Sequence, residues 1–231
     1  MVPVGLGSRL ADVPVAILVG NRPGKTLLVT GGTDGDEYAG MEAAYALIHR
    51  FQDGNFAGKL IVIPVLNVPG FEAECSQNPI DARFPKMVFP GKADGTATER
   101  LMHWLVSGYA NHADAWMDLH GGAITEGVAP FLWAFESGVS ETDATTRNFV
   151  RASHAETVVL ERVGMLSKAG ALARKGCAYL IAESGDRGCR ADEDVERHLS
   201  WAVALMGVLG MVDAESKTPP VTQNVLRRAA I

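Results

Sequence analysis

The sequence predicts an α/β fold in which a mixed, mostly parallel central sheet is covered by helices on both faces. Short apolar runs alternate along the chain with longer segments whose apolar residues recur at helical spacing, and this alternation is typical of sheets covered by helices. The run at 59–66 (KLIVIPVL) is almost wholly apolar, as expected for a strand buried on both faces. With 231 residues, 47% of them hydrophobic, the chain is long enough for one large domain.

The first elements are expected to be two strands and a helix. The apolar stretches 13–19 and 26–30 are predicted strands, and the sequence GNRPG at 20–24 supplies the glycine and proline of a turn between them. Residues 36–51 are predicted to be a helix, because acidic residues lie in its first turn and apolar residues follow at helical spacing. The run at 59–66 is the next strand.

The segment 67–96 is expected to be irregular, because it is rich in proline and glycine and shows neither a helical nor a strand period. So long an irregular segment in a compact domain is usually functional. The elements expected after it are a helix at 98–112, a strand at 115–119, a loop at 121–129, a strand at 130–135, a helix at 141–154, a strand at 157–160, a helix at 167–175, a strand at 177–182 and a helix at 191–212. Residues 1–212 are therefore predicted to form one domain, and 213–231 a C-terminal tail or linker.

Charge and composition argue against several classes of function. The formal net charge is −6, so there is no electrostatic reason to expect a nucleic acid or an anionic membrane as a partner. The apolar helical stretch 201–212 is too short to span a bilayer, and Arg9 and Asp12 interrupt the apolar segment that a signal peptide needs. The three cysteines are isolated in sequence, which indicates reduced thiols. We therefore expect a cytoplasmic protein that acts on a small molecule, and the sequence leaves open whether it forms a homo-oligomer.

Three side chains that follow predicted strands have the chemistry of a metal site. Asp34 and Glu37 lie between a predicted strand and a predicted helix, and His120 ends another predicted strand. Because the carboxyl ends of parallel strands meet at one edge of a sheet, we expect these side chains to lie close together. Two carboxylates and one imidazole can hold a divalent cation and leave a position open for water. The alternatives are that Asp34 and Asp36 only cap the helix, and that His120 is a hydrogen-bonded histidine of the core or of a loop.

Two further acidic residues are expected to support this site. Asp118 lies two residues before His120 on the same strand, so the two side chains share a face and Asp118 can accept a hydrogen bond from the imidazole. Glu183 follows an apolar run, and a carboxylate at the end of a buried strand costs free energy unless it is paired or functional. We expect Glu183 to be the general base that takes a proton from metal-activated water. The alternative is a salt bridge from Glu183 to Arg187 or Arg190.

At these residues the chain resembles the succinylglutamate desuccinylase/aspartoacylase group of the zinc carboxypeptidase-like hydrolases. The Glu-Tyr-x-Gly variant at 37–40 is similar to members that deacetylate N-acetyl-diaminobutyrate. Matching motifs occur in the same order along nearly the whole chain: GG-x-x-GDEY at 31–38, Asn67 with Pro69 and Phe71, PID at 79–81, FPG at 89–91, TERL at 98–101, DLH at 118–120, Gly176, and Glu183 with Gly185.

The resemblance implies a zinc carboxypeptidase-like fold for a metallohydrolase catalytic domain of residues 1–212. It implies Zn²⁺ held by Asp34, Glu37 and His120, with Glu183 as base and proton shuttle. The second, β-rich domain of the group has no counterpart after residue 212, which implies a more open site.

The chain departs from the pattern of that group at several positions. The group has a histidine where this chain has Asp34. A carboxylate can reach the same metal position, but its charge makes bound water less acidic and shifts the preference toward Mn²⁺ or another divalent cation. The Asn-Arg pair with which the group binds a substrate carboxylate corresponds here to Lys86 and Met87, and an arginine that stabilises the oxyanion corresponds to Ser76. Arg83 and Lys86 lie in the same segment and are expected to compensate. The alternatives are that the substrate has no carboxylate at this place, or that the protein no longer catalyses.

The leading interpretation is a metal-dependent hydrolase, a deacylase or amidohydrolase that cleaves the amide bond of a small N-acylated amino acid or related polar amide. Glu183 is the predicted base, and Arg83 or Lys86 is predicted to steady the oxyanion. The predicted substrate-binding residues are Asn67, Ser76, Arg83 and Lys86. The alternative, motivated by the missing histidine and arginines, is a catalytically inactive member of the group that binds a ligand or a partner protein.

Overall fold

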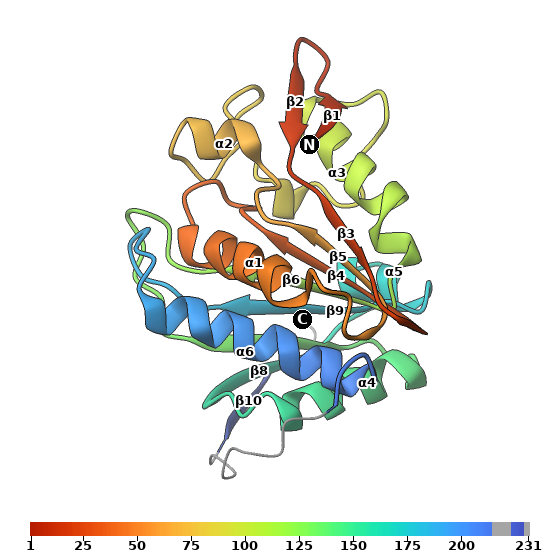
Figure 1. The fold of residues 1–231 in the computed structure, drawn as a ribbon. Coiled ribbons are helices and arrows are strands. Elements are labelled where there is room, and N and C mark those ends of the chain that lie inside the picture. Colours follow the sequence, from red (N-terminus) through yellow and green to blue (C-terminus); the bar gives the residue numbers. More distant parts are fainter. Residues whose placement is uncertain (214–222, 229–231) are drawn as a thin grey trace.

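A computed structural model describes residues 1–213 and 223–228. Within them eight strands form one sheet in the order β10-β8-β7-β9-β6-β4-β5-β3, and β1 and β2 form a separate hairpin (Figure 1). The strands are β1 (Val2–Gly5), β2 (Leu10–Val13), β3 (Ala16–Val19), β4 (Arg22–Gly31), β5 (Ala57–Ile63), β6 (Ala115–His120), β7 (Phe131–Glu136), β8 (Thr157–Arg162), β9 (Ala178–Glu183) and β10 (Asn224–Arg228).

The sheet is mixed but mostly parallel, as predicted. Neighbouring strands from β5 through β4 and β6 to β9 are parallel, and β8 is parallel to both β7 and β10. The antiparallel pairs are β7 with β9 and β3 with β5. Parallel strands in the middle of a sheet are buried on both faces, and this explains the apolar run that the sequence shows at β5.

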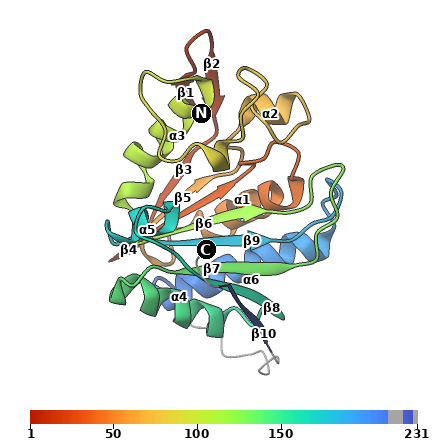
Figure 2. The same cartoon turned by 180° about the vertical axis from the view of Figure 1, so that it is seen from behind.

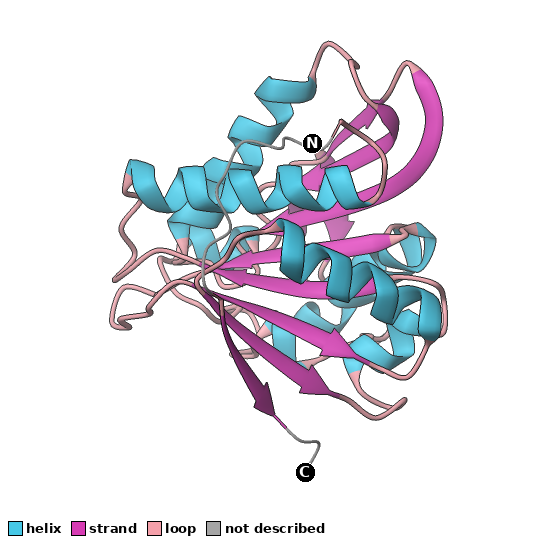
Figure 3. Ribbon diagram, turned by 90° about the horizontal axis from the view of Figure 1, so that it is seen from below, coloured by secondary structure: helices cyan, strands magenta, loops and turns pink. Residues whose placement is uncertain are grey.

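Helices cover both faces of the twisted sheet (Figure 3). α1, α4 and α6 pack on one face, where the core includes Leu27 and Val29 of β4. α3 and α5 pack on the other, where the core includes Leu28 of the same strand (Figure 2). The alternation of Leu27, Leu28 and Val29 between two cores follows from the period of two along a strand. The helices are α1 (Tyr38–Phe51), α2 (Val68–Glu72), α3 (Ala97–Gly108), α4 (Ser140–Ala152), α5 (Lys168–Ala173) and α6 (Asp192–Val208), with short 3₁₀ turns η1 (Pro85–Met87) and η2 (Ala110–His112).

Several element boundaries differ from the predictions. The predicted strand at 13–19 is two strands, because β2 pairs with β1 and only β3 joins the large sheet. The predicted turn at 20–24 is shorter, since β4 begins at Arg22. The irregular segment 67–96 contains the short helix α2 and the turn η1. Their brevity explains why no periodicity is visible in the sequence.

The predicted tail or linker at 213–231 lies partly outside the described residues. Its described part contains β10, which pairs with β8 in parallel register from Asn224↔Thr157 to Arg228↔Glu161. These five residues are therefore an edge strand rather than a free tail. Hydrogen bonds to a distant strand create this element, and its exposed, mixed composition gives no local signal for it. In the described part of the chain, none of the helices combines the length and apolar character needed to cross a membrane.

Candidate active site

The three predicted metal ligands lie at the carboxyl edge of the sheet. Asp34 and Glu37 lie in the connection from β4 to α1, and His120 is the last residue of β6. β6 lies on one side of β4, whereas the chain continues from β4 to β5 on the other side. Open α/β sheets bind ligands at such a reversal of the strand order. Gly32 has a φ of 60°, which lets the chain turn sharply out of β4 into the site.

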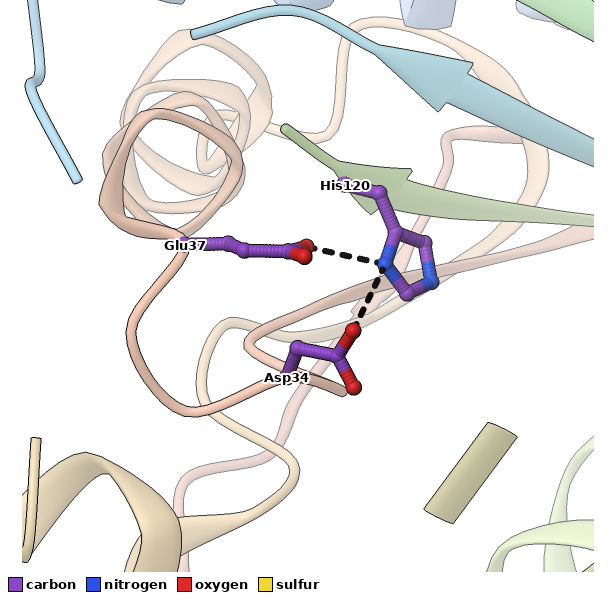
Figure 4. Close-up of side chains that lie close together, drawn as sticks. All are labelled: Asp34, Glu37 and His120. Atoms are coloured by element: carbon purple, nitrogen blue, oxygen red, sulfur yellow. Dashed lines mark hydrogen bonds and ion pairs between the residues drawn. The ribbon is translucent and has the colours of Figure 1, made fainter. Parts of the chain in front are cut away.

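Asp34, Glu37 and His120, here called the ligand cluster, offer one oxygen or nitrogen each, and these atoms lie within 4.8 Å of one another (Figure 4). Nδ1 of His120 is 2.9 Å from Oε2 of Glu37 and 3.8 Å from Oδ2 of Asp34. All three side chains are buried. Within the described structure Oδ1 of Asp34 has no hydrogen-bond partner, and a buried polar atom without a partner is costly. This donor set, with an unsatisfied oxygen, fits a divalent cation.

Excess negative charge in the ligand cluster supports the same conclusion. Burial raises the pKa of Asp34 to about 6, since the charged form is poorly solvated there. Burial also lowers the pKa of His120, but the carboxylates of Asp118 and Glu37 outweigh it and hold that pKa well above its usual value. The raised pKa values of the Asp34 carboxyl group and the His120 imidazole describe a site in which a divalent cation can take the place of bound protons.

The predicted alternative, in which Asp34 and Asp36 only cap α1, does not hold. The carboxylate of Asp34 pairs with Lys86. That of Asp36 accepts hydrogen bonds from the hydroxyl of Ser76 and the backbone N–H of Ile124.

Glu37, the N-cap residue of α1, does not cap the helix with its side chain either. Its Oε2 instead accepts a hydrogen bond from the backbone N–H of Gly121, at 3.1 Å. Figure 4 shows the side chain of Glu37 directed from the start of the helix toward His120 at the end of β6. Glu37 therefore links two elements that are far apart in the sequence.

Asp118 lies on the far side of the His120 ring, as its position on the strand predicts. Oδ2 of Asp118 is 3.3 Å from Nε2 of His120. The hydroxyls of Thr30 and Thr33 donate to Oδ1 at 2.6 and 2.7 Å, and the hydroxyl of Tyr179 donates to Oδ2 at 3.1 Å. Because the carboxylate of Asp118 contacts Nε2 of His120, Nδ1 is the ring nitrogen that faces Asp34 and Glu37. Carboxylates commonly orient metal-binding histidines in this way.

The three hydroxyl groups that hold Asp118 were not among the predicted site residues. Each comes from a different place: Thr30 from β4, Thr33 from the turn after it, and Tyr179 from β9. Thr30 and Tyr179 are polar side chains within otherwise apolar strands. That contrast was the one local signal for them, because buried hydroxyls need hydrogen-bond partners.

Glu183, the predicted general base, ends β9 directly beside the ligand cluster. It lies opposite His120 in the parallel register of β6 and β9. Burial raises the pKa of Glu183 to about 7, while the positive charges of His120 and Lys86 oppose this rise. A carboxyl group whose pKa lies near neutrality is well matched to accepting and returning a proton.

The alternative in which Glu183 is neutralised by a nearby arginine is wrong. Among the described ion pairs, Arg187 binds Asp186 at 3.5 Å and Arg190 binds Glu42 at 2.6 Å. Both arginines are largely exposed. Surface pairs of this kind contribute little to stability. They leave the half-buried Glu183 without either arginine as a partner among the described ion pairs.

Lys86 reaches the ligand cluster from η1. Its Nζ forms an ion pair with Oδ2 of Asp34, the oxygen that also faces Nδ1 of His120, and it lies 5.5 Å from the centroid of the Phe84 ring. Burial lowers the pKa of Lys86, but the adjacent Asp34 carboxylate outweighs it and raises that pKa. The ammonium group thus offsets part of the charge that the extra carboxylate brings.

The other predicted substrate-binding residues make contacts of their own. Asn67 is fully buried; its Oδ1 caps α2 and its Nδ2 donates to the carbonyl of Ser76 at 3.2 Å. The hydroxyl of Ser76 donates to Oδ1 of Asp36 at 2.7 Å. Arg83 is half-exposed and lies 3.3 Å from Glu99. These contacts shape the irregular segment, and a direct role of Asn67, Ser76 or Arg83 in binding substrate stays a prediction.

A mixed, mostly parallel sheet covered by helices, with a buried Asp-Glu-His cluster at its carboxyl edge, defines an α/β protein with a candidate metal site. The chain belongs to the succinylglutamate desuccinylase/aspartoacylase catalytic domain family, whose sequence profile matches residues 23–196. This range contains the whole ligand cluster and Glu183, and the match confirms the resemblance drawn from the motifs.

Individual relatives agree with this family. The chain is 27% identical over 221 residues to N-alpha-acetyl-L-2,4-diaminobutyric acid deacetylase of Halomonas elongata, covering 91% of this chain but 62% of the relative. It is similar to a succinylglutamate desuccinylase from Silicibacter sp. TM1040, with a TM-score of 0.82 and 26% identity over 92% of this chain and 65% of the other. The fold also matches a succinylglutamate desuccinylase/aspartoacylase from Rhodobacter sphaeroides, with a TM-score of 0.83 and 23% identity over 98% and 69% of the two chains.

Proposed function

We propose that the protein is a metal-dependent deacylase that hydrolyses the amide bond of a small N-acylated amino acid or a related polar amide. The observation that carries this proposal is the convergence of Asp34, Glu37 and His120 within 4.8 Å, with Glu183 beside them at the end of β9. The family to which the chain belongs supports the reaction class. The deacetylase named among its relatives supports an N-acetylated amino acid as substrate.

The resident cation is proposed to be Zn²⁺, with Mn²⁺ or another divalent ion as the alternative. When bound, such a cation would polarise the amide carbonyl and activate a water molecule. Two of the three ligands are carboxylates. Such a site favours oxygen-preferring metals more strongly than a histidine-rich site does. The residues that would hold the cation are Asp34, Glu37 and His120.

Side chains of this protein would supply proton transfer, orientation of His120 and stabilisation of the oxyanion. Glu183 would accept a proton from the attacking water and return it to the nitrogen of the leaving amine, for which a pKa of about 7 is suitable. Asp118 would keep His120 oriented through Nε2. The ammonium of Lys86 would stabilise the negative charge that develops on the carbonyl oxygen, and Arg83 is the second candidate for that role.

The function is tested with purified protein and a panel of N-acetyl and N-succinyl amino acids, including N-acetyl-2,4-diaminobutyrate. Zn²⁺, Mn²⁺ or Co²⁺ is added to chelator-treated protein, and the release of free amine is measured. We expect turnover with at least one acyl amino acid, and none without added metal. Bound metal without any turnover would contradict the deacylase, and would instead favour a catalytically inactive protein that binds a ligand or a partner.

Replacing Lys86 by Met is expected to tighten metal binding about tenfold. The ammonium holds the Asp34 oxygen that faces His120, so it competes with a cation for that oxygen, and a tenfold change corresponds to about 1.4 kcal/mol. The dissociation constant for Zn²⁺ is measured by competition with a chromophoric chelator. Lys92→Met, an exposed lysine of the same segment, is the control and should bind like the wild type. Unchanged or weaker binding in Lys86→Met would show that this lysine does not compete with the metal.

A further inference from the structure

Lys168 places an ammonium group inside the protein, on the side of the sheet away from α1 and α6. It is the first residue of α5, and only 16% of its side chain is exposed. Nζ lies 4.1 Å from the ring centroids of both Trp116 and Tyr179. Burial lowers the pKa of Lys168 to about 8. A buried ammonium group is costly unless it is paired, so the partners of this group indicate its role.

Those partners lead to Asp118. Nζ of Lys168 donates to the hydroxyl oxygen of Tyr179 at 2.7 Å, and the same hydroxyl donates to Oδ2 of Asp118 at 3.1 Å. Nζ also lies 3.6 Å from that Oδ2. A continuous chain of contacts thus runs from Lys168 through Tyr179 to the carboxylate that faces Nε2 of His120.

The surroundings of Asp118 leave its carboxylate a single arrangement. Oδ1 accepts the hydroxyls of Thr30 and Thr33, and Oδ2 faces Tyr179, Lys168 and the imidazole. The nearest positive charge outside the ligand cluster that the described ion pairs give Asp118 is Lys168. Without Lys168, the fully buried carboxylate of Asp118 would keep its three hydroxyl donors. It would lose the cation next to Oδ2 that helps to hold the carboxylate in this position.

We propose that Lys168 is a positioning residue which, through Tyr179 and Asp118, holds the His120 ring with Nδ1 facing Asp34 and Glu37. This inference rests on the metal site of the proposed function. It assigns a role to a lysine that is 48 residues from His120 and, in the described part of the chain, forms its hydrogen bond and ion pair with Tyr179 and Asp118 and not with the ligand cluster. The competing interpretation is that Lys168 only fills space between Trp116 and Tyr179. Met has a similar length and fills the same space between the rings without the charge, so Lys168→Met separates the two.

The first measurement is metal affinity. We expect Lys168→Met to bind Zn²⁺ about tenfold more weakly than wild type, the lower end of the effect seen when a carboxylate behind a metal-binding histidine is altered. Lys175→Met, at an exposed lysine after the end of the same helix, should bind like the wild type. In the Co²⁺-loaded protein, the visible absorption spectrum of Lys168→Met should change, whereas the Lys175→Met spectrum should not. Equal affinity and an equal spectrum in Lys168→Met would overturn the proposal.

A second variant, Tyr179→Phe, tests the same chain of contacts independently of Lys168. Tyr179→Phe removes the bridging hydroxyl but keeps the ring, and we expect it to weaken Zn²⁺ binding in the same direction. The double variant should lose less than the product of the two single effects, because both act on Asp118. If Lys168→Met does not fold, the test depends on Tyr179→Phe alone. An unchanged affinity of Tyr179→Phe for Zn²⁺ would then contradict the proposed positioning of His120 through Tyr179 and Asp118.

The ¹⁵N NMR signals of the His120 ring are compared in the metal-free proteins. A change in the Nε2 signal of Lys168→Met or Tyr179→Phe is expected, and its absence in both would overturn the proposal. This measurement also separates the proposed metal site from the proposed positioning role of Lys168. Should wild-type protein bind no divalent cation, the proposed metal site fails, while the ring signals still report whether Lys168 orients His120.

Discussion

Glu183→Gln is expected to lower kcat about 10³-fold, within the range by which a general base contributes to catalysis. Gln has nearly the same shape as Glu but cannot accept the proton of the attacking water. Because Glu183 is not one of the three predicted ligands, metal content should stay at the wild-type level and KM should change little. Steady-state kinetics and elemental analysis of the same preparation check both expectations.

The pH profile gives a second test of the same residue. Burial raises the pKa of Glu183 to about 7, and only its deprotonated form accepts a proton. The kcat/KM of the wild type should therefore rise as the pH increases toward about 7, and a bound cation would move this acidic limb to lower pH. The limb should be absent from the residual activity of Glu183→Gln.

A matched control comes from another strand end. Glu136 also ends a strand, β7, but β7 runs antiparallel to β9, so Glu136 lies at the opposite edge of the sheet. Glu136→Gln should keep its kcat within about twofold of wild type, since this side chain pairs with Arg147 and Arg162 at the far end of the sheet and not with the ligand cluster. Retention of wild-type kcat in Glu183→Gln would remove Glu183 from the mechanism.

His120→Ala is expected to remove both stoichiometric metal and activity. The imidazole supplies the only nitrogen of the ligand cluster, and its loss leaves Asp34 and Glu37 as two carboxylates without a third ligand. A cation stabilises the transition state by several kcal/mol, so we expect kcat/KM to fall about 10³-fold or more. Metal content and kinetics are measured after dialysis.

The exposed His112 provides the control for this substitution. His112→Ala should retain both metal and turnover, because it changes a surface imidazole outside the ligand cluster. Treatment of wild type with a chelator should reproduce the His120→Ala defect, and added Zn²⁺ or Mn²⁺ should restore activity to wild type alone. Turnover in His120→Ala at the wild-type rate would contradict the metal site.

The ligand cluster could be predicted because each member has a local signature. Asp34 and Glu37 follow one apolar run and His120 ends another, and parallel strands bring such positions to one edge. Asp118 could be placed behind His120 because side chains two residues apart on a strand share a face. Glu183 was predicted to be the general base because a carboxylate at the end of a buried strand is costly, and this role stays a prediction.

The residues around the cluster could not be predicted with the same success. The sequence places Lys86 in an irregular segment, and only the folded chain reveals its ion pair with Asp34. Asn67 and Ser76 were predicted to bind substrate, which stays a prediction. Their contacts with α2 and Asp36 are visible only in the folded chain. Lys168 begins a short helix and looks like an ordinary surface lysine in sequence, although it is largely buried beside Trp116 and Tyr179.

By itself, the amino-acid sequence determined the class of fold, the position of the main strands and helices, and which side chains meet in the ligand cluster. Periodicity reports these features because it records which face of each element is buried. Only the tertiary structure decided the order of the strands, the pairing of β10 with β8, and the partners of the buried charges. Such pairings depend on elements that are distant in the chain, and the free energy of a buried charge depends on which of them comes close enough to compensate it.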